Sequence, residues 1–240
     1  MEDLAAGGLN TCEIARATGI PRSTVHHWRA NHRHEIQLCR TCGARRPGDA
    51  EIPFEAYAYL FGLYLGDGYI ARHPKDVFRL DVALDARYPR IIAECRAAVR
   101  LVMPNSRCAT VKRPGCLIVT SYSRHWPCLF PQHGPGHKHE REIVLAAWQR
   151  DVVRAYPQAL LRGLIHSDGS RHLNTVHSPA GRAYAYPRYE FSNRSDDIRR
   201  IFTHACDLLG IQWRPTNRWN ISVARRESVA RMDEFVGPKR

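Results

Sequence analysis

Two short segments of the chain share one pattern, in which an apolar run ends in an aspartate followed by a glycine. YLFGLYLGDGYI (59–70) and LLRGLIHSDGSR (160–171) both contain L-x-G-L-x-x-x-D-G, which places Asp67 and Asp168 101 residues apart. Two converging carboxylates repel each other unless a positive charge lies between them. A divalent cation such as Mg²⁺, which prefers oxygen ligands, suits such a pair. Metal ions held in this way support phosphodiester hydrolysis, because they polarise the phosphoryl oxygen and activate a water.

The apolar runs have the spacing of buried helices, and each carries small residues on one face. Gly62 lies four residues before Gly66, and Gly163 lies four residues before Ser167. Residues four apart share a helix face, and small side chains let two helix backbones approach closely. We therefore expect the two helices to pack side by side and to bring both aspartates to the same level. The glycine after each aspartate would let the chain turn out of its helix.

The elements after each copy of the pattern also correspond. Period-2 alternation predicts strands over 79–85 and 188–195, and amphipathic spacing predicts helices over 88–102 and 195–210. In the second helix Ser195 or Asp196 is the expected cap and Gly210 the expected stop. Hairpins are predicted for 107–113 with 116–123 and for 212–218 with 219–226, followed by short helices at 125–130 and 227–237. The sequence thus predicts an α+β fold of two pseudo-symmetric αββαββα halves, 54–140 and 141–240.

The composition indicates a polyanionic partner. Of 240 residues, 36 are Lys or Arg and 23 are Asp or Glu, a formal net charge of +13. A charge of this size and sign favours nucleic acid. No apolar run approaches the ~18 to 20 residues of a membrane span, and the first residues lack the basic start and apolar core of a signal peptide. We therefore expect a soluble, cytoplasmic protein without a membrane association.

The paired motifs resemble those of the LAGLIDADG homing endonucleases, and the resemblance covers roughly residues 54–237. Both copies keep the aspartate at the eighth position of the nine-letter motif, and they depart from it at Phe61, Tyr64, Leu65 and Gly66 and at Arg162, His166 and Ser167. The resemblance implies a saddle of two four-stranded antiparallel sheets that grips double-stranded DNA. It also implies a monomeric pseudo-dimer that cuts both strands across the minor groove and leaves short 3′ overhangs.

The resemblance further implies a set of site residues. Asp67 and Asp168 would be catalytic and would bind Mg²⁺ or Mn²⁺, together with the backbone carbonyls of Gly66 and Ser167. The family often places a basic residue after the last strand of each half, near the scissile phosphates. Arg124 and Arg226 are the candidates here for this catalytic role, and Arg225 and Lys138 for DNA contacts. An arginine stabilises negative charge but does not exchange protons as the more usual lysine can.

Side chains on the strands would read the DNA sequence, because arginine pairs with guanine and asparagine with adenine. The candidates within the two halves are Arg79, Arg188, Ser192, Arg194, Arg214, Asn217, Arg218 and Asn220, with the acidic Asp81 and Glu190 beside them. Which of the alternating strand faces carries them depends on the register of the strands.

The first 33 residues resemble a small all-α helix-turn-helix. Asn10 and Glu13 form a capping pair for its first helix, Gly19 makes the turn and Pro21 suits the start of the second helix. DNA recognition would then come from the second helix, through Arg22, Ser23, Thr24, His26, His27 and Arg29. The alternative interpretation is a helical adaptor that binds protein.

Residues 34–53 form a polar linker that carries one CxxC pair, Cys39 and Cys42. These two cysteines are candidate ligands of a structural Zn²⁺, which needs four ligands in all. The remaining ligands would come from His32, His34, Cys116, Cys128 or His133. The alternative is a pair of reduced thiols in a turn.

The sequence leaves two main functions open. The first is a site-specific double-strand DNA endonuclease, and the second is a DNA-binding transcriptional regulator that retains the LAGLIDADG fold without cutting. The presence of both aspartates favours cleavage, because bare carboxylates repel the DNA backbone and a regulator has no use for them. An RNA-splicing role is a weaker third interpretation.

Overall fold

The computed structural model describes residues 10–19, 21, 22, 25, 52–177, 181–237 and 239. The chain forms two compact units, Met1–Glu51 and Ile52–Arg240. The larger unit therefore begins two residues before the predicted first half. Within the described residues, no helix is long and apolar enough to cross a membrane.

In the smaller unit, α2 (Thr11–Thr18) is the one helix whose residues are all described. The predicted capping pair is present: the Asn10 side chain accepts from the Glu13 amide at 3.1 Å, and Glu13 accepts from the Asn10 amide at 2.7 Å. Gly19 ends the helix in the left-handed conformation (φ 68°), which costs glycine little. Ser23, Thr24, His26, His27 and Arg29 lie outside the described residues, so the second helix of the motif stays a prediction.

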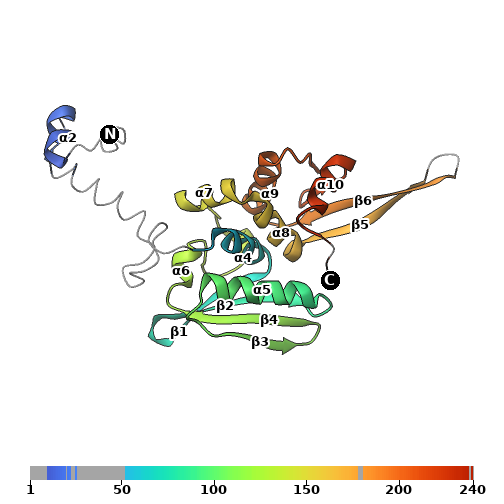
Figure 1. The fold of residues 1–240 in the computed structure, drawn as a ribbon, viewed down its shortest axis with the longest axis horizontal. Coiled ribbons are helices and arrows are strands. Elements are labelled where there is room, and N and C mark those ends of the chain that lie inside the picture. Colours follow the sequence, from blue (N-terminus) through green and yellow to red (C-terminus); the bar gives the residue numbers. More distant parts are fainter. Residues whose placement is uncertain are drawn as a thin grey trace. The chain divides into compact units, whose positions relative to one another are not determined.

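The larger unit contains two halves with the same order of elements (Figure 1). The first half comprises α4 (Phe54–Asp67), β1 (Gly68–His73), the 3₁₀ turn η1 (Pro74–Asp76), β2 (Val77–Asp85), α5 (Pro89–Val102), β3 (Cys108–Arg113), β4 (Cys116–Ser123) and α6 (Trp126–Leu129). After η2 (Lys138–Glu140), the second comprises α7 (Ala147–Ala155), α8 (Pro157–Asp168), β5 (Gly169–His177), β6 (Ala183–Ser192), α9 (Asp196–Leu208), β7 (Arg214–Pro215), β8 (Asn220–Val223) and α10 (Arg226–Asp233). The predicted α+β repeat is confirmed at this level.

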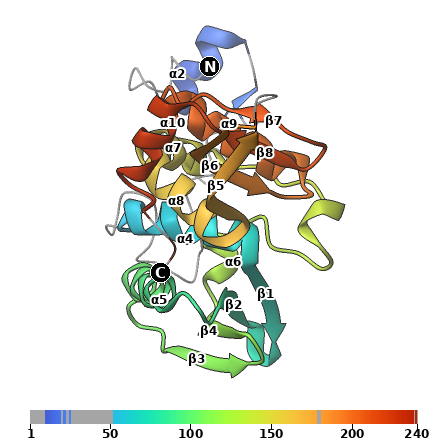
Figure 2. The same ribbon diagram turned by 90° about the vertical axis from the view of Figure 1, so that its right-hand side faces the viewer.

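Each half builds one four-stranded antiparallel sheet, in the orders β1-β2-β4-β3 and β5-β6-β8-β7. Along β2, the buried residues Leu80, Val82 and Leu84 alternate with more exposed ones, so one face of the sheet packs on helices and the other faces solvent. In Figure 2, β1 and β2 of the first sheet and β7 and β8 of the second lie to the right of α4, α5, α7, α8 and α10.

Helices α4 and α8 pack against each other more extensively than any other two helices (Figure 1). A Cβ atom added to Gly163 would lie 2.2 Å from the carbonyl oxygen of Tyr59, and one added to Gly62 would lie 2.5 Å from that of Leu160. No real side chain tolerates these distances, so only glycine allows the two backbones to come this close. The predicted seam between glycine-notched helices is confirmed.

The glycine that follows each aspartate has a different role from the predicted one. Gly68 (φ −87°, ψ 150°) and Gly169 (φ −107°, ψ 170°) are extended and not left-handed. Each begins a strand, and a Cβ on Gly68 would lie 2.4 Å from the Tyr64 Cα, whereas one on Gly169 would lie 2.7 Å from the Ile165 Cα. These glycines are therefore needed for close approach to the preceding helical turn, and not for a positive φ.

Several elements differ from those predicted, and the first strand of each half, β1 and β5, had not been located in the sequence. Helix α7 was not expected, and it adds a buried Gln149 that donates to the Tyr57 hydroxyl at 2.7 Å. The strand predicted for 188–195 ends at Ser192. The Asn193 side chain accepts from the Ser195 amide at 2.8 Å, and Ser195 caps α9, so these local bonds turn the chain before the strand can continue.

His166, one of the departures from the nine-letter motif, is a buried structural residue. Its Nδ1 lies 3.0 Å from the Tyr59 hydroxyl and its Nε2 lies 3.3 Å from the Val236 carbonyl oxygen. Burial, together with the charge of Arg162, lowers the pKa of His166 to about 4. The ring is therefore neutral near pH 7, and it ties α8 to α4 and to the segment after α10.

Candidate active site

Asp67 and Asp168 are the last residues of α4 and α8, and the close packing of these helices brings their ends together. A Cβ on Gly66 would lie 2.2 Å from Ser167 Oγ and 3.0 Å from Asp168 Cγ. Both aspartates are half-buried. Burial raises the pKa of Asp67 to about 6, with a further contribution from the charge of Asp168, and burial also raises the pKa of Asp168.

Two lysines face this acid pair. Lys138, in η2, donates from Nζ to the Gly66 carbonyl at 2.7 Å, and Lys239 donates to the Ser167 carbonyl at 3.4 Å. Both ammonium groups attract both carboxylates. Burial nevertheless lowers the pKa of Lys138 to about 8, because the cost of desolvation exceeds this attraction. The sequence had assigned Lys138 to a phosphate of the DNA backbone, and the structure places it in the acid pair's own site.

Lys239 was missed by sequence reasoning, although a signal for it was present. Lys138 and Lys239 are 101 residues apart, the same separation as the aspartates, and each follows the aspartate of its own half by 71 residues. A Gly-Pro pair precedes both lysines within five positions. Extending the internal repeat to the end of the chain would have found this second lysine.

Asn193 makes the two acids unequal. Its Nδ2 donates to Asp168 Oδ2 at 2.6 Å, and this bond favours the charged form and lowers the pKa of Asp168 against the effect of burial. The Arg199 guanidinium holds the Asn193 backbone carbonyl at 2.5 Å, so the amide is fixed before any ligand arrives. Within the described part of the chain, no such side-chain hydrogen bond to Asp67 is found.

The donor set suits a hard divalent cation. Two half-buried carboxylates meet at the seam, and backbone carbonyls lie beside them, so all available ligands are oxygens. The described residues contain no cluster of three or more His, Cys, Asp or Glu side chains that could hold a metal ion. A cation here would therefore rest on the two aspartates, backbone oxygens and water. Cys39 and Cys42, the predicted zinc ligands, lie outside the described residues.

The arginines predicted to assist catalysis lie away from the acids. Gly68, directly after Asp67, pairs with Val82, which in turn pairs with Val119 of β4. Arg124 lies five residues further along the chain, which corresponds to roughly 16 Å of extended strand. In the second half, Gly169 pairs with Phe191, which pairs with Ile221 of β8. Arg226 lies five residues after Ile221, beyond the end of β8, and is the first residue of α10. The structure thus brings Lys138 and Lys239, rather than these arginines, to the acid pair.

Several predicted DNA-reading residues do share the solvent-facing side of the second sheet. Glu190 of β6 pairs with Ser170 and Ser222 on the neighbouring strands. The alternate residues of β6, Tyr189 and Phe191, are buried on the other face of the sheet. The same exposed face carries Arg188, Ser192, Arg214 and Asn220. In the first sheet, Arg79 lies on the equivalent face, where its Nε is 2.9 Å from Asp81 Oδ2.

The other predicted readers lie in turns beside the second sheet. The Asn217 side chain accepts from the backbone amides of Trp219 and Asn220 at 2.8 and 2.9 Å, so it shapes the β7–β8 turn. Arg194 and Arg218 lie over the Trp219 ring, at 5.5 and 5.9 Å from its centre. Asn217 is therefore a structural residue of the turn, whereas the two arginines keep their charges at the surface.

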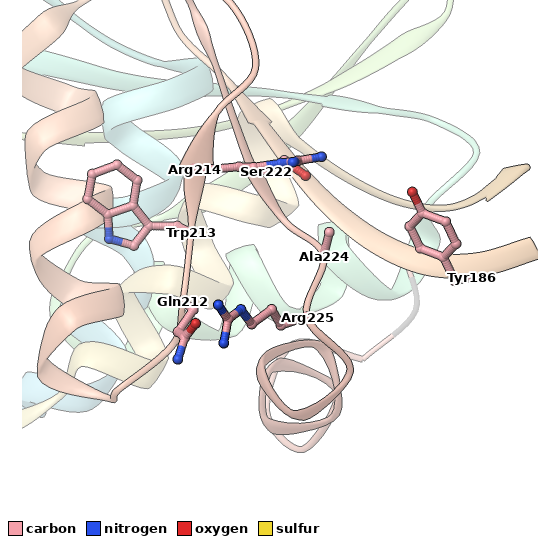
Figure 3. A pocket seen from close by; sticks show the side chains of 7 residues that line it. All are labelled: Tyr186, Gln212, Trp213, Arg214, Ser222, Ala224 and Arg225. Carbon is pink, nitrogen blue, oxygen red and sulfur yellow. The ribbon is translucent and has the colours of Figure 1, made fainter. Parts of the chain in front are cut away.

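A pocket of about 570 Å³ opens beside the second sheet (Figure 3). Its lining consists of Tyr186, Gln212, Trp213, Arg214, Ser222, Ala224 and Arg225. Figure 3 shows Arg214 alongside Ser222, with Tyr186 across from them, while Trp213 points away. Trp213 Nε1 donates to Asp207 at 2.7 Å, which fixes the indole against α9. The predicted DNA contacts Arg214 and Arg225 thus share one hollow.

No protein-family model and no curated protein matches the sequence. Solved structures do match the fold. A mesophilic variant of the homing endonuclease I-DmoI superposes with a TM-score of 0.50 at 12% identity, over 77% of this chain and 91% of that one. I-DmoI in complex with DNA and Mn superposes with a TM-score of 0.50 at 12% identity, over 77% and 97%. The N-terminal LAGLIDADG domain of DUF199/WhiA gives a TM-score of 0.46 at 14% identity. At these identities the likeness shows the α+β LAGLIDADG fold alone.

Proposed function

We propose that this chain is a site-specific double-strand DNA endonuclease that hydrolyses phosphodiesters with a divalent metal, Mg²⁺ or Mn²⁺. The observation that carries the proposal is the meeting of Asp67 and Asp168, half-buried at the ends of two glycine-notched helices. Burial of two like charges is unfavourable, so a structural role alone gives no reason to keep both. The similar fold of I-DmoI, solved with DNA and Mn, supports the same kind of site.

The two aspartates would hold the cation, with the Gly66 and Ser167 carbonyls as further oxygen donors. When bound, the metal supplies positive charge to the phosphoryl oxygen and lowers the pKa of a bound water. Asn193 holds the Asp168 carboxylate in one orientation through its 2.6 Å bond. Preorganisation of this kind matters, because small errors in ligand position cost large factors in rate.

Lys138 and Lys239 would stabilise the negative charge that develops on the phosphate. They reach the site from the two halves and already interact with both acids. With a pKa lowered to about 8, Lys138 can also exchange a proton near neutral pH, which an arginine cannot do. Arg124, Arg225 and Arg226 are assigned to the DNA backbone, away from the scissile bonds.

DNA would lie across the solvent-facing sides of the two sheets, and the net charge of +13 supplies the long-range attraction. We assign the N-terminal helix-turn-helix, with Arg22, to an additional DNA contact, and Cys39 and Cys42, in the linker that follows it in the sequence, to a structural Zn²⁺. Both halves of the site belong to one chain, so a monomer suffices.

Incubation of the purified full chain with a randomised duplex library tests the proposal. Cut products that appear with Mg²⁺ and vanish with chelator support it, and their ends give the stagger. Affinity for the selected duplex should fall steeply with salt, because counterions are released on binding. Absence of cleavage in both Mg²⁺ and Mn²⁺ would overturn the nuclease assignment.

One observation favours the second candidate, a DNA-binding regulator that retains the fold. In the structure the Gly66 and Ser167 carbonyls, which would complete the metal site, each accept a hydrogen bond from a lysine. These ammonium groups compensate the acids without any metal. The library separates the two functions, since a regulator would enrich bound duplexes and yield no cut ones.

A further inference from the structure

The solvent-facing side of the first sheet carries a row of apolar side chains. Ala83 pairs with Ile118, and Ile118 pairs with Val111, so the three lie side by side across β2, β4 and β3. Val111 is 39% exposed. Ala71 and Ala109 occupy neighbouring positions of the same face. None of these side chains can form a hydrogen bond to a base.

The arginine at the centre of this face is already engaged. Arg79 lies with its Nε 2.9 Å from the Asp81 carboxylate, and Tyr122 and Asp81 both raise the pKa of its guanidinium. The ion pair between this guanidinium and the Asp81 carboxylate must break before Arg79 can pair with guanine. This row of the first sheet therefore offers shape and methyl groups, and the exposed Tyr69 and Tyr122 lie on the same face.

The same face of the second sheet is polar almost throughout. Tyr186 accepts from Asn174 Nδ2 at 2.8 Å and from Arg188 at 3.1 Å, and Asn220 Nδ2 donates to Glu190 at 3.0 Å. These bonds link neighbouring strands into a network that holds amide and guanidinium groups at the surface. Such groups pair with adenine and guanine in the major groove.

The pocket of Figure 3 extends this polar face. Arg214 and Arg225 both line it, and in the described part of the chain neither guanidinium has an ion-pair partner. Both side chains are exposed. Unlike Arg79, they are free to donate hydrogen bonds to a phosphate oxygen or to the acceptor edge of a guanine.

We propose that the two sheets read the two arms of the DNA target by different chemistry. The first sheet selects thymine through contacts between the Ala83–Ile118–Val111 row and the thymine methyl groups. The second sheet selects purines through hydrogen bonds from Arg188 and Arg214. The inference rests on the proposed DNA-binding function, and it assigns to this chain an A·T-rich arm facing the first half and a sharply specified, guanine-containing arm facing the second.

The test begins with the full-length D67N/D168N double variant, which should bind without cutting, and a randomised duplex library. Sequencing of the bound fraction should return an asymmetric target. Arg188→Ala identifies the arm read by the second sheet, because it should relax base preference in that arm alone, with a loss of roughly 10- to 100-fold in affinity. The other arm is then the one that faces the first sheet.

Deoxyuridine in place of thymine then tests the methyl contacts, since it removes only the C5 methyl group and leaves base pairing intact. In the first-sheet arm, each contacted thymine should cost about fourfold in affinity, as expected for one buried methyl. Equal substitution in the Arg188 arm should change affinity less than twofold. Val111→Ser should reduce the deoxyuridine effect, and thermal unfolding checks that this variant is folded.

The outcomes separate the inference from the function on which it rests. A library from which no sequence is enriched would overturn both. Enrichment with guanine-rich preferences in both arms, or affinity indifferent to deoxyuridine in the first-sheet arm, would overturn the division of chemistry and leave the DNA-binding function standing.

Discussion

Lys138 and Lys239 are related to each other as the two aspartates are: they lie 101 residues apart, and each donates to the carbonyl oxygen of the residue before the aspartate of its half. The pseudo-symmetry of the chain therefore extends beyond the helices to the cations of the site. The acid pair is held together by two ammonium groups from segments that follow each sheet.

Replacement of Asp67 by Asn should abolish cleavage and stabilise the metal-free protein. The pKa of Asp67 is raised to about 6, so the folded state binds its proton more tightly than the unfolded chain and loses stability as the pH rises from about 4 to 6. Asn removes this cost, which is worth up to about 3 kcal/mol above pH 6. Denaturant unfolding at pH 4.5 and 7.5 should show a much larger gain at the higher pH. An equal gain at both values would contradict the assignment.

Lys138→Ala and Lys239→Ala should each slow cleavage by roughly 10²-fold, because each removes a cation that faces the developing charge of the phosphate. Affinity for the target should change little. Lys138→Arg should restore the positive charge but not proton exchange, so its cleavage rate should lie between those of the unmodified protein and Lys138→Ala. Single-turnover cleavage with saturating protein measures these rates. An unaltered rate in either alanine variant would leave that lysine with a structural role alone.

Gly163→Ala should separate the paired helices. Its Cβ would lie 2.2 Å from the Tyr59 carbonyl oxygen, a backbone atom that cannot move independently. We expect the free energy of unfolding to fall by about 3 kcal/mol. Cleavage activity should be lost as well, because the aspartates at the helix ends would move apart. Gly134→Ala is the matched control, since its Cβ would meet only the flexible Arg141 side chain at 3.4 Å. Chemical denaturation compares the two, and equal effects would argue against the tight seam.

Asn193→Ala should slow cutting of one DNA strand more than the other. The bond from Asn193 Nδ2 orients Asp168 only, so its loss leaves the site asymmetric and should allow nicked duplex to accumulate. Asn105→Ala, at an exposed position after α5, serves as the control. A supercoiled plasmid bearing the target reports nicked and linear products separately. Parallel slowing of both strands would mean that Asn193 acts on the whole site.

The repeated pattern determined the core of the architecture. The L-x-G-L-x-x-x-D-G copies, their glycines and the matched strand and helix periods are local features. They predicted the paired helices, three of the four strands in each half and the position of Asp67 and Asp168. Helix α7 was not predicted, although Gln149, Val152 and Val153 give it one buried face. The strand at 188–195 was overextended, since side-chain bonds at Asn193 and Ser195 outweigh its alternation.

Only the tertiary structure decided which basic side chains lie beside the two aspartates and which pair with other acidic residues. Lys138 and Lys239 arrive from segments remote in sequence from the aspartates, and Arg79 is engaged by Asp81 although its sequence pattern resembles that of Arg188. Local patterns fix the type of each element, because they depend on near neighbours and on the period of burial. The partners of a charged side chain depend on register and helix packing, and these are set by contacts between residues far apart in the chain.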